Sequence, residues 1–146
     1  IFLGDHVLFD ISPNIVLWTW EDDALGEYLK SLLAVQELPV KTALPAHRTA
    51  GSIPLAARAE ELINHHQRRI EELSAIVRGW PGLTCYEVAA RMKWSIRAAS
   101  WDDFPPSQKY FAVCECMAHL QHMCCSGLAE RRTDANSVMR YYAKGK

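Results

Sequence analysis

Carboxylate and imidazole side chains stand at the ends of two short apolar segments. Asp5 and His6 interrupt the apolar run that opens the chain, and His47 follows the apolar residues 42–45. Carboxylate oxygens and imidazole nitrogens are common ligands of divalent metals, and the end of a strand holds them rigidly. Because neighbouring side chains on a strand point to opposite faces, Asp5 and His6 cannot both serve one site. From position alone, Asp5 and His47 are either metal ligands or structural, solvent-facing residues, and His6 is expected to be a packing or pocket residue.

Two further groups of polar residues are candidates for the lining of a pocket. Ser12 and Asn14 lie in the loop after the first apolar run, where they either face a pocket or cap a proline-shaped turn. His65, His66 and Arg69 lie on a predicted long helix. There they either have a function, by touching an anionic substrate or orienting the C-terminal domain, or belong to a solvated helix face paired with glutamates three or four residues away. Both interpretations are open from the sequence.

The five cysteines do not suggest a disulfide framework. Their number is odd, and four of them lie in one predicted helix beside His119 and His122. This usage favours a reducing, cytoplasmic setting. A structural zinc site needs ligands from two elements, so we expect core side chains here rather than a metal site. The cysteines are Cys85, Cys114, Cys116, Cys124 and Cys125.

The elements that position the metal candidates alternate between strand and helix in the first 80 residues. Residues 1–8 have the pattern of a buried strand and residues 42–45 that of a second strand. Asp22 and Asp23 place negative charge in the expected first turn of a helix. The spacing of apolar side chains then predicts a long amphipathic helix over about residues 55–78.

The remaining residues have a different order, namely helix, helix and two-stranded ribbon. Thr84 followed by Glu87 is a capping-box pattern, which predicts a short helix. Ser107 is expected to cap a second helix over residues 108–125. The ribbon strands are expected at residues 128–132 and 138–143. This order indicates a winged helix-turn-helix.

Length and composition agree with one or two folded domains. The chain has 146 residues, of which 49% are apolar and 23% charged, and its net charge is −1. A bulk basic signature for nucleic acid is therefore absent, and no apolar run is long enough to cross a membrane. Residues 1–83 carry a net charge of −4 and residues 84–146 one of +3. With the turn signal at Pro81–Gly82, this shift predicts domains at residues 1–80 and 81–146.

The first residues also bear on the partners of the chain. It opens with Ile1 rather than Met and runs directly into the predicted strand. A lone strand leaves backbone groups unpaired along its edge. We therefore expect the C-terminal part of a longer protein, whose missing N-terminal half is a partner, with self-association when that half is absent.

Five sequence strings together resemble a known family. They are GDHVL at residues 4–8, ISPNI at 11–15, YLKSL at 28–32, LPAH at 44–47 and HHQRR at 65–69. In this order they resemble the C-terminal portion of metallo-β-lactamase-fold hydrolases, in the branch with lactamase-like and endoribonuclease-like members. The resemblance implies an α+β chain, in which the C-terminal part of an αββα fold precedes a mostly helical winged-helix domain.

The resemblance also implies a metal centre with Asp5 bridging two zinc ions, or other divalent metals, and His47 binding the second ion. A metal-bound hydroxide would then attack a polarised ester, thioester or phosphodiester. The family's His-x-His-x-Asp-His motif and a further histidine are not in this sequence. The family's Pro-Gly-His-Gly reads Pro-Ala-His-Arg, with Arg48 in place of a turn glycine. We therefore expect the full-length parent to hold two ions, and this chain alone to hold few or none and to be inactive.

Three functions follow from these observations. The first is a cytoplasmic hydrolase of small ester-like or thioester-like substrates. The second is RNA phosphodiester cleavage, with the basic ribbon holding the RNA strand. The third is a winged-helix interaction module without enzymatic activity. Specific DNA recognition is not expected, because the helix over residues 108–125 offers little positive charge beyond Lys109. A membrane partner is not expected either, because the sequence has no apolar run of the length that a membrane span requires.

Overall fold

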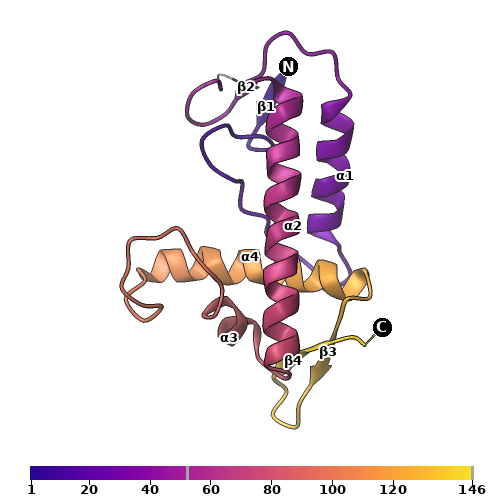
Figure 1. Ribbon diagram of the computed structural model, residues 1–146, viewed down its shortest axis with the longest axis vertical. Helices are drawn as coiled ribbons and strands as arrows, with labels where there is room; N and C mark the ends of the chain where they lie inside the picture. The colour runs from indigo at the N-terminus through magenta and orange to yellow at the C-terminus, as the bar shows by residue number, and fades with distance from the viewer. Residues whose placement is uncertain (52, 146) are drawn as a thin grey trace. The chain divides into compact units, whose positions relative to one another are not determined.

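The computed structural model describes residues 1–51 and 53–145. Strands and helices alternate in the first part of the chain, and two further helices and a two-stranded ribbon follow (Figure 1). The elements are β1 (Phe2–Gly4), α1 (Ala24–Gln36), β2 (Leu44–Pro45), α2 (Leu55–Gly79), α3 (Cys85–Ala89), α4 (Pro106–Cys125), β3 (Ala129–Thr133) and β4 (Met139–Ala143). The mixed α+β class expected from the sequence is thereby confirmed. In the described part of the chain, no helix combines the length and the apolar character that a membrane span requires.

The chain forms two compact units, and neither is continuous in sequence. Unit 1 consists of Ile1–Asn14 and Gly26–Arg68, and unit 2 consists of Ile15–Leu25 and Arg69–Lys146. Helix α2 therefore contributes its first part to unit 1 and its last part to unit 2. The domain ranges 1–80 and 81–146 stay a prediction.

In unit 1, strands β1 and β2 form a two-stranded parallel sheet. Phe2 pairs with Leu44 and Gly4 with Pro45. The predicted strand over residues 1–8 is too long, because the chain turns directly after β1. The His6 N–H donates to the Leu3 carbonyl over 3.1 Å, and Gly4 adopts the left-handed φ of 56° that this turn needs.

Helices α1 and α2 provide the apolar core of unit 1. Gln36 near the end of α1 donates to the carbonyl of Ala56 near the start of α2, while Tyr28 lies against His66, so the two helices run antiparallel. They lie side by side in Figure 1. The amphipathic pattern predicted for α2 is confirmed in this unit, where Leu55, Ala59 and Leu62 are buried. Helix α1 begins at Ala24, so Asp22 and Asp23 precede it rather than filling its first turn, which was the expectation.

In unit 2, helix α3 has the capping box that the sequence predicts. The Glu87 N–H donates to Thr84 Oγ1 over 3.3 Å, and the Thr84 N–H donates to the Glu87 carboxylate over 2.8 Å. The predicted Ser107 cap of α4 is wrong. Pro105 takes the cap position and Pro106 the first helical position, where a missing N–H costs nothing and the fixed φ suits a helix.

Helix α4 is followed by the predicted ribbon, strands β3 and β4. They pair antiparallel in one continuous register from Ala129 opposite Ala143 to Thr133 opposite Met139. The turn between them is organised by the Asp134 carboxylate, which accepts from the N–H groups of Asn136 and Val138. The observed order of helix, helix and ribbon agrees with the expected order. Its assignment as a winged helix stays a prediction.

Residues 15–25, which lead into α1 and include its first two residues, complete unit 2. The Gln121 side-chain amide on α4 donates to the Trp20 carbonyl over 2.7 Å and to the Asp22 carbonyl over 3.2 Å. Next to it, His122 Nδ1 donates to both oxygens of the Asp23 carboxylate at 3.0 and 3.1 Å. These contacts give the residues before α1 a defined place on α4.

The five cysteines are all free thiols in mixed surroundings. Cys114 and Cys116 are buried, Cys85 and Cys124 are half-buried, and Cys125 is exposed. Burial raises the pKa of the Cys116 thiol well above its usual range. The uncharged thiol then behaves as a small apolar core group. Within the described residues, no cluster of three or more histidine, cysteine, aspartate or glutamate side chains is placed to hold a metal ion.

Candidate metal centre

Asp5 and His47, the two predicted metal ligands, lie next to each other in unit 1. His47 Nε2 is 3.2 Å from Asp5 Oδ1, and about two thirds of each side chain is exposed. The pairing of β1 with β2 produces this approach. The Ala46 N–H donates to the Gly4 carbonyl over 2.9 Å, which joins the residues that directly precede the two candidate ligands. Two strand ends thus present one carboxylate and one imidazole at a single exposed point.

The turns beside both candidate ligands use left-handed backbone. Gly4 precedes Asp5 with a φ of 56°, and Arg48 follows His47 with a φ of 68°. The left-handed region costs a residue with a Cβ roughly 1–2 kcal/mol relative to glycine. The backbone is therefore left-handed at the position where the family resemblance expects a glycine. This chain has Arg48 there, which adopts the same conformation at an energetic cost.

His6 lies against helix α1. Its Nε2 is 3.0 Å from Ser31 Oγ, and its ring meets the ring of Tyr28 edge to face at 5.1 Å. Partial burial lowers the pKa of His6 from its usual 6.5, so the neutral ring is favoured. Asp5 is directed to His47 and His6 to α1. Both residues lie in the turn after β1, so the alternation expected for a strand is not the cause.

Tyr28 and His66 are the buried members of a row of four rings in unit 1. Tyr28 meets His66 edge to face at 5.5 Å, and His66 meets His65 in the same way at 5.1 Å. Tyr28 also donates its hydroxyl proton to the His6 carbonyl over 2.9 Å. Tyr28 was not among the residues expected at the site, although its spacing of three residues from Ser31 places both on one face of α1.

Arg69 belongs to unit 2, where it is almost fully buried. Its guanidinium donates from Nε to Glu115 at 3.0 Å and from Nη1 to Glu72 at 2.9 Å and to the Lys93 carbonyl at 2.7 Å. The same group lies 4.1 Å above the ring of Trp94. These contacts join α2, α4 and the segment after α3, so Arg69 stabilises the packing of these three parts of unit 2.

Ser12 and Asn14, the remaining pocket candidates, are exposed in the loop that follows Phe9. The loop is held by Arg58 of α2, which donates to the Leu8 carbonyl at 2.7 Å and to the Ile11 carbonyl at 3.0 Å. The role of Ser12 and Asn14 in a pocket stays a prediction.

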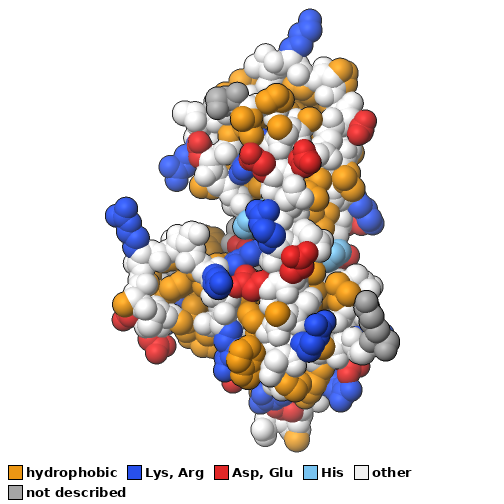
Figure 2. Space-filling model, viewed as in Figure 1, with side chains coloured by type: hydrophobic (Ala, Val, Ile, Leu, Met, Phe, Trp, Pro, Cys, Tyr) orange, Lys and Arg blue, Asp and Glu red, His pale blue; other side chains and the backbone are white. Residues whose placement is uncertain are grey.

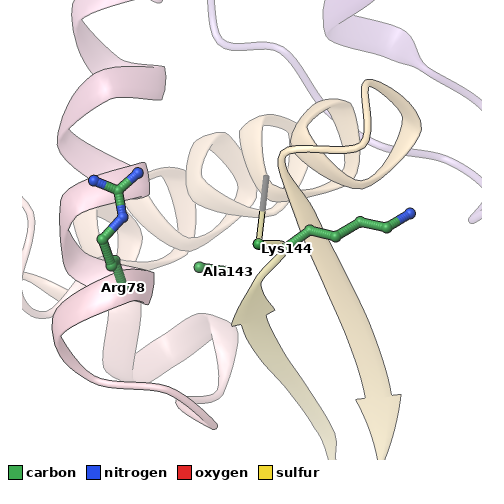
Figure 3. Close-up of a pocket in the computed structure, with 4 residues that line it drawn as sticks. Arg78, Ala143 and Lys144 are labelled. Carbon is green, nitrogen blue, oxygen red and sulfur yellow. The ribbon is translucent and has the colours of Figure 1, made fainter.

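Three open hollows of the described residues are lined by residues other than Asp5 and His47. Two of them, of about 390 and 400 Å³, share Phe9, Ala50, Gly51 and Ile53 in unit 1. The third, of about 530 Å³, lies in unit 2 and is lined by Arg78, Ala143, Lys144 and Gly145. Figure 3 shows that the side chains of Arg78 and Lys144 extend in different directions. The two cations therefore do not converge on one ligand.

Comparisons with known proteins agree on one kind of protein. Residues 102–144 match a family model described as the metallo-β-lactamase-like C-terminal domain. The chain is similar to a β-lactamase domain protein from Burkholderia ambifaria, with 26% identity and a TM-score of 0.78. It is also similar to a metallo-β-lactamase family protein from Thermus thermophilus, with 30% identity and a TM-score of 0.73. Each match covers 96% of this chain and 40% of the solved chain. No curated protein matches the sequence.

Proposed function

Since residues 102–144 match the metallo-β-lactamase-like C-terminal domain family, and the chain has the fold of the C-terminal part of such proteins, we propose that it is part of a metal-dependent hydrolase. The observation that carries this proposal is the 3.2 Å approach of Asp5 and His47 at two strand ends. Their exposure leaves both groups accessible to a metal ion and to a substrate. The proposed substrate class is a small ester or thioester.

The donor set suits a divalent cation. Asp5 offers carboxylate oxygens and His47 an imidazole nitrogen, which is the ligand chemistry of zinc in hydrolytic sites. When bound, zinc activates a water molecule and polarises the bond to be broken. The part of this chain is to hold the two ligands at a fixed separation, through the hydrogen bond between Ala46 and Gly4. A two-ion centre, as in the family resemblance, is part of the proposal.

Two ligands are too few for such a centre, so further ligands must come from elsewhere. The chain spans 40% of the length of the solved chains that it matches. We propose that additional residues of the full-length protein supply the other ligands and cover the apolar edge at β1 and β2. There, Phe2 is 86% exposed, and Ile1 and Leu44 are also exposed. Without that cover the edge would favour self-association.

The arginines of the ribbon do not favour the alternative of RNA cleavage. Arg131 donates to Gln121 and to the Trp20 carbonyl, Arg132 pairs with Glu130, and Arg140 pairs with Asp134. Groups engaged in this way are less available to phosphates. Figure 2 shows positive and negative side chains interspersed on the visible face. RNA binding is therefore an outcome of the test below and not a second proposal.

The test is the metal content of the full-length protein together with its Asp5→Asn variant. We expect about two zinc ions per chain in the wild type, as in two-metal hydrolases, and a loss of metal in the variant. Asp10→Asn is the matched control, because Asp10 is an exposed aspartate of the same unit that binds Thr49 instead. The zinc-loaded protein should hydrolyse members of an ester and thioester panel.

Absence of metal from the full-length wild type would refute the hydrolase and favour the interaction module. Metal binding with RNA affinity that falls steeply with salt, and without ester hydrolysis, would favour the ribonuclease instead.

A further inference from the structure

Asp5 lies between two residues that are anchored in different ways. On one side, the Gly4 carbonyl accepts a hydrogen bond from the N–H of Ala46, the residue that directly follows β2. On the other side, His6 follows in the turn closed by its own N–H bond to Leu3. The Asp5 side chain itself is largely exposed. Besides the contact of its Oδ1 with His47 Nε2 at 3.2 Å, its carboxylate is held in place through the backbone that precedes and follows it.

Helix α1 supplies the anchor on the His6 side. The Tyr28 hydroxyl donates to the backbone carbonyl of His6 over 2.9 Å, and Ser31 Oγ lies 3.0 Å from His6 Nε2. One contact fixes the peptide that follows the Asp5 turn, and the other fixes the rotation of the His6 ring. Because Tyr28 and Ser31 are three residues apart on a helix, a single rigid face makes both contacts.

Tyr28 is itself firmly held. Its side chain is 8% exposed, and its ring lies between those of His6 and His66, with edge-to-face contacts on both sides. Burial raises the pKa of Tyr28 well above its usual range, so the hydroxyl stays protonated and remains a donor at any physiological pH. Because Tyr28 is held by these contacts, its hydrogen bond to the His6 carbonyl fixes the turn relative to α1.

We propose that Tyr28, together with Ser31, is a positioning residue that fixes the Asp5 carboxylate for metal binding. The proposal rests on the proposed function, since it assigns the metal-ligand role to Asp5. Neither residue touches the metal or the substrate. Both act through His6, and the reaction is hydrolysis at the centre that Asp5 and His47 help to form.

The experiment measures zinc affinity of the full-length protein by competition with a chromophoric chelator, for wild type, Tyr28→Phe, Ser31→Ala and Asp5→Asn. Tyr28→Phe keeps the ring contacts and removes only the donor to His6. Loss of an outer hydrogen-bond partner weakens metal binding by roughly 10–100-fold, so we expect about 10-fold for this indirect contact. Ser31→Ala should weaken binding in the same direction. Tyr86→Phe is the control, because Tyr86 is a half-exposed tyrosine on α3 in unit 2.

A second readout separates positioning from a general loss of stability. With cobalt in place of zinc, the visible absorption spectrum reports ligand geometry in protein that is still folded by circular dichroism. We expect an altered spectrum for Tyr28→Phe and an unchanged one for Tyr86→Phe. If Tyr28→Phe does not fold, Ser31→Ala decides the question, since Ser31 is exposed and its loss leaves the core intact.

One result would overturn the positioning role and leave the proposed function standing. In it, the folded Tyr28→Phe and Ser31→Ala variants have the zinc affinity and the cobalt spectrum of the wild type, while Asp5→Asn loses its zinc. A wild type that binds no zinc would overturn both.

Discussion

Replacing Arg69 with lysine should destabilise unit 2 although the positive charge is kept. In the wild type, one planar guanidinium serves Glu115, Glu72 and the Lys93 carbonyl, and it also stacks on Trp94. A lysine ammonium has no planar fork and no flat face to stack. It can bind one of the carboxylates in good geometry and must leave the others less well paired.

The magnitude follows from the hydrogen bonds that a lysine cannot reproduce. The Arg69 side chain is 10% exposed, and those of Glu72 and Glu115 are 23% and 19% exposed, so solvent replaces the missing donors only in part. Hydrogen bonds to charged groups are worth about 1.5–3 kcal/mol each. We therefore expect Arg69→Lys to lower the free energy of unfolding by about 2 kcal/mol. Arg69→Ala leaves two carboxylates uncompensated and should cost about 3–5 kcal/mol.

Urea unfolding followed by tryptophan fluorescence is the assay. The five tryptophans all lie in unit 2, so the signal reports on the unit that contains Arg69. With a urea dependence of about 1–3 kcal/mol per M, the midpoint should fall by about 1 M in Arg69→Lys. Arg68→Lys is the matched control, because Arg68 is the exposed neighbour on the same helix. Equal midpoints for Arg69→Lys and Arg68→Lys would refute the assignment of stability to these contacts.

Three smaller changes test other parts of the fold. A Cβ at Gly51 would overlap the ring of Phe9, so Gly51→Ala should cost about 1–3 kcal/mol in thermal unfolding, and a neutral result would contradict this packing. Gly4→Ala meets no neighbouring atom, so it should cost only the left-handed strain of roughly 1–2 kcal/mol, measured in the same way. The hydrogen bond from the Thr84 N–H lowers the pKa of Glu87 below its usual 4.5. The carboxylate therefore adds stability above pH 4.5, and this stability is lost as the pH falls through the folded-state pKa. Glu87→Gln should make the thermal unfolding midpoint less dependent on pH over that range. The same pH dependence in the variant and the wild type would count against the capping box.

Features that depend on local sequence were the ones that could be predicted. The capping box of α3 requires only Thr84 and Glu87, and α2 follows from an apolar spacing sustained over many residues. Asp5 and His47 were selected because each follows a short apolar segment, and the pairing of β1 with β2 places their side chains 3.2 Å apart. Their role as metal ligands stays a prediction.

Features that depend on turns or on distant partners could not be read in this way. The strand over residues 1–8 is interrupted because Gly4 takes a left-handed φ, which an apolar pattern does not reveal. In the sequence, Tyr28 has the pattern of an aromatic residue on the buried side of a helix, and nothing in that pattern indicates the hydrogen bond from its hydroxyl to the His6 carbonyl. Arg69 looks like a surface cation of α2, since its partner Glu115 lies 46 residues later in the chain.

The placement of residues 15–25 within unit 2 sets an order of folding during synthesis. Both pieces of unit 1 have been translated once Arg68 is made. The partners of Trp20 and Asp23 on α4 appear about 100 residues after them, so unit 2 cannot close before then. Contacts of such long sequence separation form slowly, because a large loop must first be ordered. During synthesis, residues 15–25 therefore stay without their partners on α4 after both pieces of unit 1 have been translated. A fragment restricted to residues 102–144 would not contain residues 15–25.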